Sequence, residues 1–249
     1  MKNGNPAITR MLTATPATGV VSEPCSYRGI ALKSLYFVGL TFLSAIVSVV
    51  LFQRVIAENY PLYYVVSVGC AIAAVISGLL AYRIATPVLG SVYVLSEGFL
   101  VGTLSMLFEG VYRGIVFGAL LATVITLGIT ILLNATGVLR AGRRLRNTVF
   151  IAMISVVVVQ LLLWLLTLIL PSIALVFANS FWLQLLVCVV MTCLAAFNLL
   201  IDVDNVNQIV ACAQPKSLEW KASFSLVVSL IWLYVEFLRI LAIFADRKD

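Results

Sequence analysis

Seven apolar stretches, each about as long as a bilayer is thick, constrain this chain more than any other feature of its sequence. A helix that crosses about 30 Å of hydrocarbon needs roughly 20 residues. The predicted spans cover residues 34–52, 62–82, 88–108, 114–133, 148–170, 182–202 and 222–244. Short polar connections separate them, so we expect an all-α integral membrane protein, a seven-transmembrane helix bundle.

The composition agrees with a lipid environment. Of 249 residues, 63% are hydrophobic and 10% are charged, and the mean hydropathy is +1.14, whereas soluble domains carry about 25% charged residues. Residues 1–30 are polar and rich in Pro, Thr, Ser and Gly, which predicts a mobile N-terminal tail before a membrane domain over residues 31–249. Within the spans, Gly98 with Gly102 and Gly114 with Gly118 have the spacing of closely packed helices.

The basic residues indicate how the helices are oriented, because Lys and Arg concentrate in cytoplasmic loops. With a cytoplasmic amino terminus, eleven basic residues lie inside and four lie outside. The inner set is Lys2, Arg10, Arg28, Lys33, Arg83, Arg140, Arg143, Arg144, Arg146, Lys216 and Lys221; the outer set is Arg54, Arg113, Arg247 and Lys248. We therefore predict a cytoplasmic amino terminus and an outside carboxyl terminus.

Several function classes lack the residues that they need. The chain has no histidine, which excludes Ser-His-Asp and Cys-His catalysis and the H-E-x-x-H zinc proteases. Its five cysteines form no C-x-x-C pair, and no G-x-x-x-x-G-K-[ST] loop is present. The basic residues flank apolar spans, which indicates topology and not a nucleic-acid site, so we expect no nucleic-acid partner. We expect neither an enzyme nor a cofactor, apart from a calcium ion.

Four acidic residues lie within or at the ends of the spans: Glu97, Asp202, Asp204 and Glu236. An ionisable side chain in a membrane span is costly and is a functional hypothesis by default. The structural alternatives are a hydrogen bond from Glu97 to a neighbouring helix, a solvated helix end for Asp204, and an i,i+3 ion pair of Glu236 with Arg239.

Asp202 and Asp204 are expected on different faces of their helix, because two positions differ by about 200°. Asp202 aligns with Asn198 and Asn205 in a polar stripe, which predicts that it faces the bundle interior. Asp204 is predicted nearer the cytoplasmic mouth. Carboxylates that meet in a low-dielectric site share a proton, and their hard oxygen atoms also suit calcium.

Motifs in most of the chain resemble prokaryotic Bax inhibitor-1-like proteins. The end of the sixth span and the last span are the most specific, and the other motifs agree with the bacterial branch of the family. The matching segments are 195–204 (AAFNLLIDVD) with Gln208, 213–216 (AQPK), 219–220 (EW), 231–241 (IWLYVEFLRIL), 95–102 (LSEGFLVG), 137–140 (GVLR) and 5–7 (NPA).

This resemblance implies a fold in which the last helix is central, and a location in a bacterial plasma (inner) membrane. In the better-known branch, members are linked to a pH-sensitive calcium leak, and one acid on each of the last two helices senses protons. The matching positions here are Asp202, with Asp204 one alignment step away, and Glu236. Both Asp202 and Glu236 are also the candidate calcium ligands.

The spacing of Asp202 and Glu236 along the chain does not fit direct contact across a symmetric hairpin. A symmetric hairpin with its tip near Pro215 places Asp202 opposite about residue 228, and Glu236 lies about 12 Å further along its helix. Direct contact therefore needs a longer or offset connection. Without that connection, Glu97 is an alternative partner for Asp202.

Three functions compete at this point. The first is a calcium or cation leak channel or transporter gated by protonation of Asp202, Asp204, Glu236 and Glu97, with Arg239 and Asn198 beside them. The second is a non-transporting regulator that binds other membrane proteins, such as a membrane protease. The third, a membrane-embedded enzyme, has no visible nucleophile, metal cluster or cofactor loop.

Overall fold

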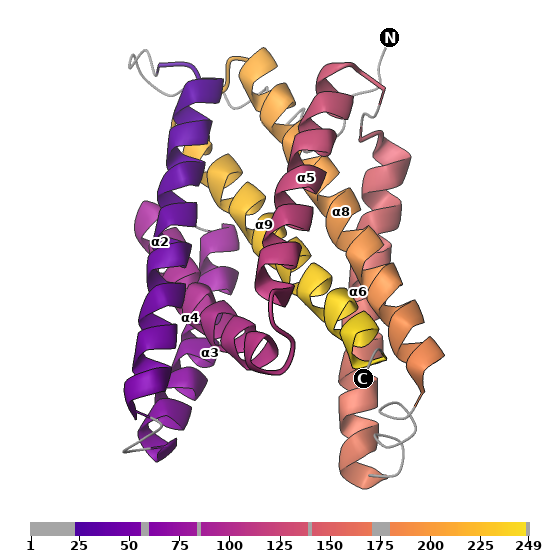
Figure 1. Ribbon diagram of the computed structural model, residues 1–249. Helices are drawn as coiled ribbons and strands as arrows, with labels where there is room; N and C mark the ends of the chain where they lie inside the picture. The colour runs from indigo at the N-terminus through magenta and orange to yellow at the C-terminus, as the bar shows by residue number, and fades with distance from the viewer. Residues whose placement is uncertain (1–22, 56–59, 84–85, 139–140, 171–179, 248–249) are drawn as a thin grey trace.

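The computed structural model describes residues 23–55, 60–83, 86–138, 141–170 and 180–247. In this part of the chain, seven helices are long and apolar enough to cross a membrane, and each corresponds to one predicted span. They are α2 (Tyr27–Val55), α3 (Tyr60–Arg83), α4 (Pro87–Val111), α5 (Ile115–Ala135), α6 (Arg143–Ile169), α8 (Phe181–Ala211) and α9 (Leu218–Asp246). The seven-helix bundle is confirmed (Figure 1).

Helix α2 begins seven residues before the predicted span, at Tyr27. Ser26 caps it, because its Oγ accepts a hydrogen bond from the backbone N–H of Gly29 at 3.0 Å, as an N-cap serine does. Residues 23–30 are the described part of the expected N-terminal tail. They form the start of α2 and the short segment before it. Residues 1–22 of that tail lie outside the described residues.

Helix α9 is the centre of the bundle, as expected. It contacts α2, α4, α5 and α8 and has the largest share of buried residues among the seven spans. Figure 1 shows it running diagonally behind α2 and α5. Its buried apolar side chains, Val227, Leu233 and Leu238 among them, join the cores that it shares with its neighbours.

Two glycines of α4 let this helix pack closely on α2. A Cβ at Gly98 would lie 2.6 Å from the carbonyl oxygen of Thr41, and one at Gly102 would lie 2.6 Å from that of Ala45. This part of the small-residue prediction is confirmed. Gly114 is different, because it has a φ of +85° in the turn before α5 and a Cβ there would contact nothing within 4 Å.

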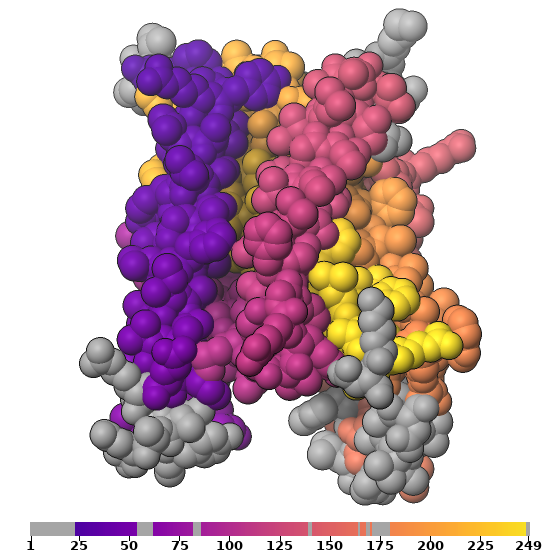
Figure 2. All heavy atoms as spheres, in the orientation of Figure 1, coloured from indigo at the N-terminus to yellow at the C-terminus, as the bar shows by residue number. Residues whose placement is uncertain are grey.

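The outer surface of the bundle is apolar, as lipid contact requires. Large side chains such as Leu35, Leu79 and Phe117 are mostly exposed. Figure 2 shows a cleft between α2 and α5 with α9 at its base, and this cleft has a volume of about 480 Å³ and almost entirely apolar walls. The central helix α9 is therefore accessible from the lipid-facing surface through this cleft.

Candidate functional site

Asp202 connects α8 to the central helix. The side chain of Ser225 donates to Oδ1 of Asp202 at 2.7 Å, and the side chain of Ser229 donates to Oδ2. Asn198 in turn donates from Nδ2 to the hydroxyl of Ser229 at 2.7 Å. Asp202 is 6% exposed. The carboxylate thus faces the bundle interior, and each of its oxygens accepts a hydrogen bond from α9.

Asp204 is equally buried, at 7% exposure, so its interpretation as a solvated helix end is wrong. Arg146 of α6 donates from Nη2 to its Oδ2 at 2.5 Å, and Gln208 donates to the same oxygen at 2.8 Å. Asn134 of α5 reaches Oδ1 at 3.5 Å. Arg146 also donates to the side chain of Asn205. The acid therefore links α8 to α5 and α6.

The two aspartates point to different sides of α8, as their spacing predicted. Asp202 reaches serines of α9, whereas Asp204 reaches Arg146 and Asn134 on α6 and α5. We call Asp202, Asp204 and these hydrogen-bonding partners the inner network. Sequence reasoning counted Arg146 only as a topology signal and did not single out Asn134, although an asparagine at the end of an apolar span was a usable signal.

Glu236 is not part of the inner network. Ser229, which bonds to Asp202, lies seven positions before Glu236 on α9, so the two acids are separated by about 10 Å along the helix axis. A symmetric α8–α9 hairpin places Asp202 opposite residue 228, which agrees with its observed partners, Ser225 and Ser229. The structure therefore does not bring Asp202 and Glu236 together as ligands of one ion.

The two carboxylate oxygens of Glu236 differ in their hydrogen bonds. Its Oε1 accepts a hydrogen bond from Trp232 Nε1 at 3.2 Å and from Arg239 Nη1 at 3.4 Å, so the i,i+3 ion pair is present. Its Oε2 is buried and has no hydrogen-bond partner among the described residues. Glu236 also lines a cavity between α4, α6, α8 and α9.

Glu97 lies on α4 and is half-buried. It makes no hydrogen bond or ion pair with any other residue that the structure describes, so the expected bond to a neighbouring helix is not formed. Asp202 takes its partners from α9, and Glu97 is not among them. The alternative pairing of Glu97 with Asp202 is therefore absent as well.

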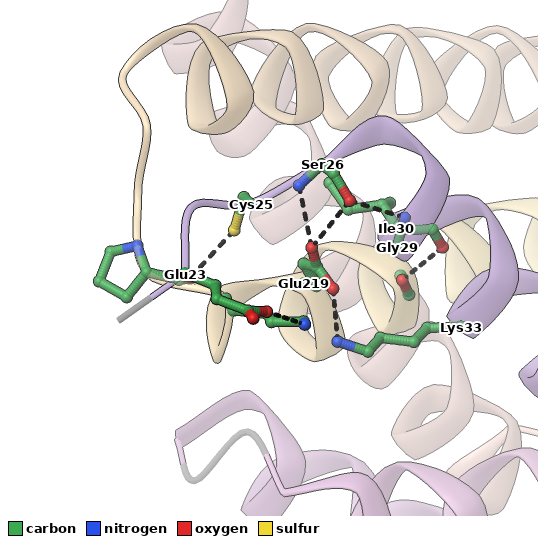
Figure 3. Close-up of polar contacts among 10 residues, drawn as sticks. Glu23, Cys25, Ser26, Gly29, Ile30, Lys33 and Glu219 are labelled. Atoms are coloured by element: carbon green, nitrogen blue, oxygen red, sulfur yellow. Dashed lines mark hydrogen bonds and ion pairs between the residues drawn. The ribbon is translucent and has the colours of Figure 1, made fainter. Parts of the chain in front are cut away.

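A further buried acid, Glu219, was not among the predicted site residues. It accepts hydrogen bonds from Ser26 N at 2.9 Å and from Ser26 Oγ at 3.3 Å, and it forms an ion pair with Lys33 at 2.6 Å. Figure 3 shows these groups converging between the start of α2 and the start of α9. Glu219 is fully buried, and its place in the family-like Glu219–Trp220 pair was the only signal in the sequence.

The segment before α2 is bound to the α8–α9 turn beside Glu219. Cys25 N donates to the carbonyl of Gln214 at 2.8 Å, and its thiol donates to the carbonyl of Pro215 at 3.0 Å. Glu23 and Lys216 form an exposed ion pair, in which the hydrogen bond and charge of Lys216 lower the pKa of Glu23. We call these contacts, together with those of Glu219, the N-terminal clasp.

The fold and these buried groups define a multi-pass membrane protein with a central last helix, to which a neighbouring helix is joined by a buried carboxylate. More specifically, the chain belongs to the Bax inhibitor 1 like family, whose family model matches residues 5–246. No curated protein matches the chain.

Proposed function

We propose that this protein is a pH-sensitive cation leak channel or transporter, with calcium as the cation, gated by protonation of intramembrane carboxylates. The observation that carries the proposal is the position of Asp202. Its carboxylate is buried at the interface of α8 with the central helix and accepts hydrogen bonds from two serines of α9. Membership of the Bax inhibitor 1 like family supports the same function.

Protonation of Asp202 changes this interface directly. An ionised carboxylate accepts hydrogen bonds with both oxygens, whereas a protonated one becomes a donor at one of them. Hydrogen bonds to a charged group are also roughly twice as strong as neutral ones. Protonation therefore weakens the connection between α8 and α9, and we expect flux to increase as the pH falls.

The charged groups around Asp202 belong to the inner network. Arg146 on α6 bonds directly to Asp204, and the partners of Asp202 on α9 are uncharged serines. The oxygens of Asp202, Ser225 and Ser229 are the hard ligands that calcium prefers. A cation that passes between α8 and α9 would contact these oxygens.

The resemblance to the bacterial branch of the family supports a location in the plasma (inner) membrane, and the arrangement of basic residues supports an amino terminus in the cytoplasm and a carboxyl terminus outside. In that orientation, the inner network and the N-terminal clasp lie in the cytoplasmic half, and the Glu236 cavity opens on the opposite side.

Calcium entry into liposomes that contain the purified protein tests the proposal. The wild type should show flux that is larger at mildly acidic than at mildly alkaline pH. Asp202→Asn, which resembles the protonated acid, should show high flux with little pH dependence. Glu97→Gln is the matched control, because it removes an intramembrane acid that forms no hydrogen bond with any residue that the structure describes.

Two outcomes contradict the proposal. One is an Asp202→Asn variant whose flux and pH dependence equal those of the wild type. The other is wild-type flux no greater than that of empty liposomes at every pH, which would favour a regulator that binds other membrane proteins, such as a membrane protease.

A further inference from the structure

The cavity beside Glu236 has the size of a ligand pocket. Its volume is about 650 Å³, within the range of roughly 300–1,000 Å³ that is typical of small-molecule sites. Helices α4, α6, α8 and α9 all contribute to its walls. It extends from Glu236 to Asp246, the last residue of α9, and these ten positions span about 15 Å of helix. The cavity therefore leads from the bundle end, where α9 stops (Figure 1), to a buried acid.

Glu236 differs from the other buried acids in how its oxygens are satisfied. Both oxygens of Asp202, Asp204 and Glu219 accept hydrogen bonds. Glu236 is 2% exposed, yet its Oε2 has no partner among the described residues. A buried carboxylate oxygen without a donor is costly, so a donor supplied by a ligand in the cavity would be favourable.

The charge of the cavity favours a ligand with one positive charge. Two carboxylates, Glu236 and Asp246, and one guanidinium, Arg239, are among its lining groups, which leaves a formal charge of minus one. Arg239 holds the Oε1 atom of Glu236 and is half-exposed. The incompletely paired carboxylate of Glu236 is thus the group beside which a cation gains most.

The walls favour an organic cation over a bare metal ion. Most of the lining surface is apolar, with Phe108, Leu163 and Met191 among its side chains, although Gln160, Thr167 and Gln184 also line the cavity. Calcium takes six to eight oxygen ligands, and no group of three or more His, Cys, Asp or Glu residues that could hold a metal occurs in the part of the chain that the structure describes. An ammonium group on an apolar body fits both the incompletely paired carboxylate of Glu236 and the largely apolar walls.

We propose that this cavity binds a small organic amine in its ammonium form, which pairs with the carboxylate of Glu236 while its apolar body contacts Phe108, Leu163 and Met191. This site consists of the cavity and its charged groups. Binding there does not depend on the proposed flux, and Asp202 takes no part in it.

The test is calorimetric titration of benzylammonium into the purified protein in lipid nanodiscs, with empty nanodiscs as the blank. Wild type should bind benzylammonium saturably, and benzyl alcohol, its uncharged analogue, should not bind saturably. Glu236→Gln should weaken binding by about tenfold or more, because it removes a buried charge partner. Asp202→Asn should leave the affinity unchanged.

A second pair of variants tests the position of the ligand without touching the charge. Val187 and Val189 are both partly exposed residues of α8, but Val187 lines the cavity and Val189 does not. Val187→Trp should reduce binding by filling the cavity, and Val189→Trp should not.

Three results would overturn the proposal: no saturable binding to wild type, equal binding to Glu236→Gln, or displacement by calcium chloride far more effectively than by sodium chloride at equal ionic strength. The last would identify a divalent-ion site. Each leaves the Asp202 flux experiment unaffected, so failure of this inference and failure of the proposed function can be distinguished.

Discussion

The inner network and the Glu236 cavity both contain buried acids, but the hydrogen bonds of these acids are completed differently. In the inner network, donors from α5, α6 and α9 surround Asp202 and Asp204, and no oxygen of either acid is left without one. In the Glu236 cavity, one oxygen of Glu236 has no described partner. Burial is nearly the same for all three acids, so the available donors, and not burial, distinguish a site that holds helices together from one that can accept a ligand.

The largest expected effect comes from removing the charged partner of Asp204. Arg146→Ala leaves a buried carboxylate unpaired and should lower the free energy of unfolding in mixed micelles by about 3 kcal/mol. Arg144→Ala, on the same turn of α6 but exposed, should have little effect. Equal effects of the two substitutions would show that the inner network contributes nothing through this ion pair.

The next effect concerns the N-terminal clasp, in which Gly29 lies against Glu219. A Cβ at position 29 would overlap the carboxylate of Glu219, which is held by Ser26 and Lys33. Gly29→Ala should therefore destabilise the protein by about 2 kcal/mol. Gly39 lies on the same helix, with nothing within 4 Å of a Cβ built on it, so Gly39→Ala should stabilise by up to about 1 kcal/mol. Thermal unfolding midpoints that move in the same direction for both would contradict the close contact.

Asp202→Asn should have a moderate effect on stability. The amide retains one acceptor for the serines but loses the charge, and hydrogen bonds to charged groups contribute more than neutral ones, so a loss of about 1 kcal/mol is expected. The change in the free energy of unfolding should be smaller in a background that already carries Ser225→Ala and Ser229→Ala. If it is the same in that background, the serines are not what stabilises the carboxylate.

Glu236→Gln is the sharpest test of the contrast between the two regions. Because one oxygen of Glu236 is unpartnered, removing its charge relieves a cost of burial, and this offsets the lost pairing with the half-exposed Arg239. We expect stability within about 1 kcal/mol of the wild type, or slightly above it. A loss larger than that of Asp202→Asn would mean that Glu236 is as fully satisfied as the inner acids.

The smallest effect belongs to the exposed pair of Glu23 and Lys216. The hydrogen bond and charge of Lys216 lower the pKa of Glu23, so the stability contributed by Glu23 is present above its unfolded pKa and is lost as the pH falls through the folded one. The same bond and charge of Glu23 raise the pKa of Lys216, and that contribution is lost only at alkaline pH. The difference in thermal midpoint between wild type and Lys216→Ala should thus be small at neutral pH, vanish in acid and shrink in high salt. A difference that persists in acid would assign it to another contact.

Much of the architecture could be predicted because membrane insertion is a local property. Each span must satisfy its own backbone hydrogen bonds and present apolar side chains to lipid, so residues 34–52 or 222–244 can be recognised without knowledge of their neighbours. The positions of Asp202 and Asp204 on different faces of α8 also follow from helix geometry alone. The same geometry placed Asp202 opposite residue 228, which lies between its observed partners, Ser225 and Ser229.

The tertiary structure decided which polar groups from distant parts of the chain meet. Four arginines lie within residues 137–147, and only the rotation of α6 against α8 selects Arg146 as the partner of Asp204. Glu219 and Lys33 are 186 positions apart, and the free oxygen of Glu236 depends on what four helices leave around it. Hydropathy determines whether a helix spans the membrane. Its tilt and rotation follow from packing against its neighbours. The tilt and rotation then determine which donor each buried carboxylate meets.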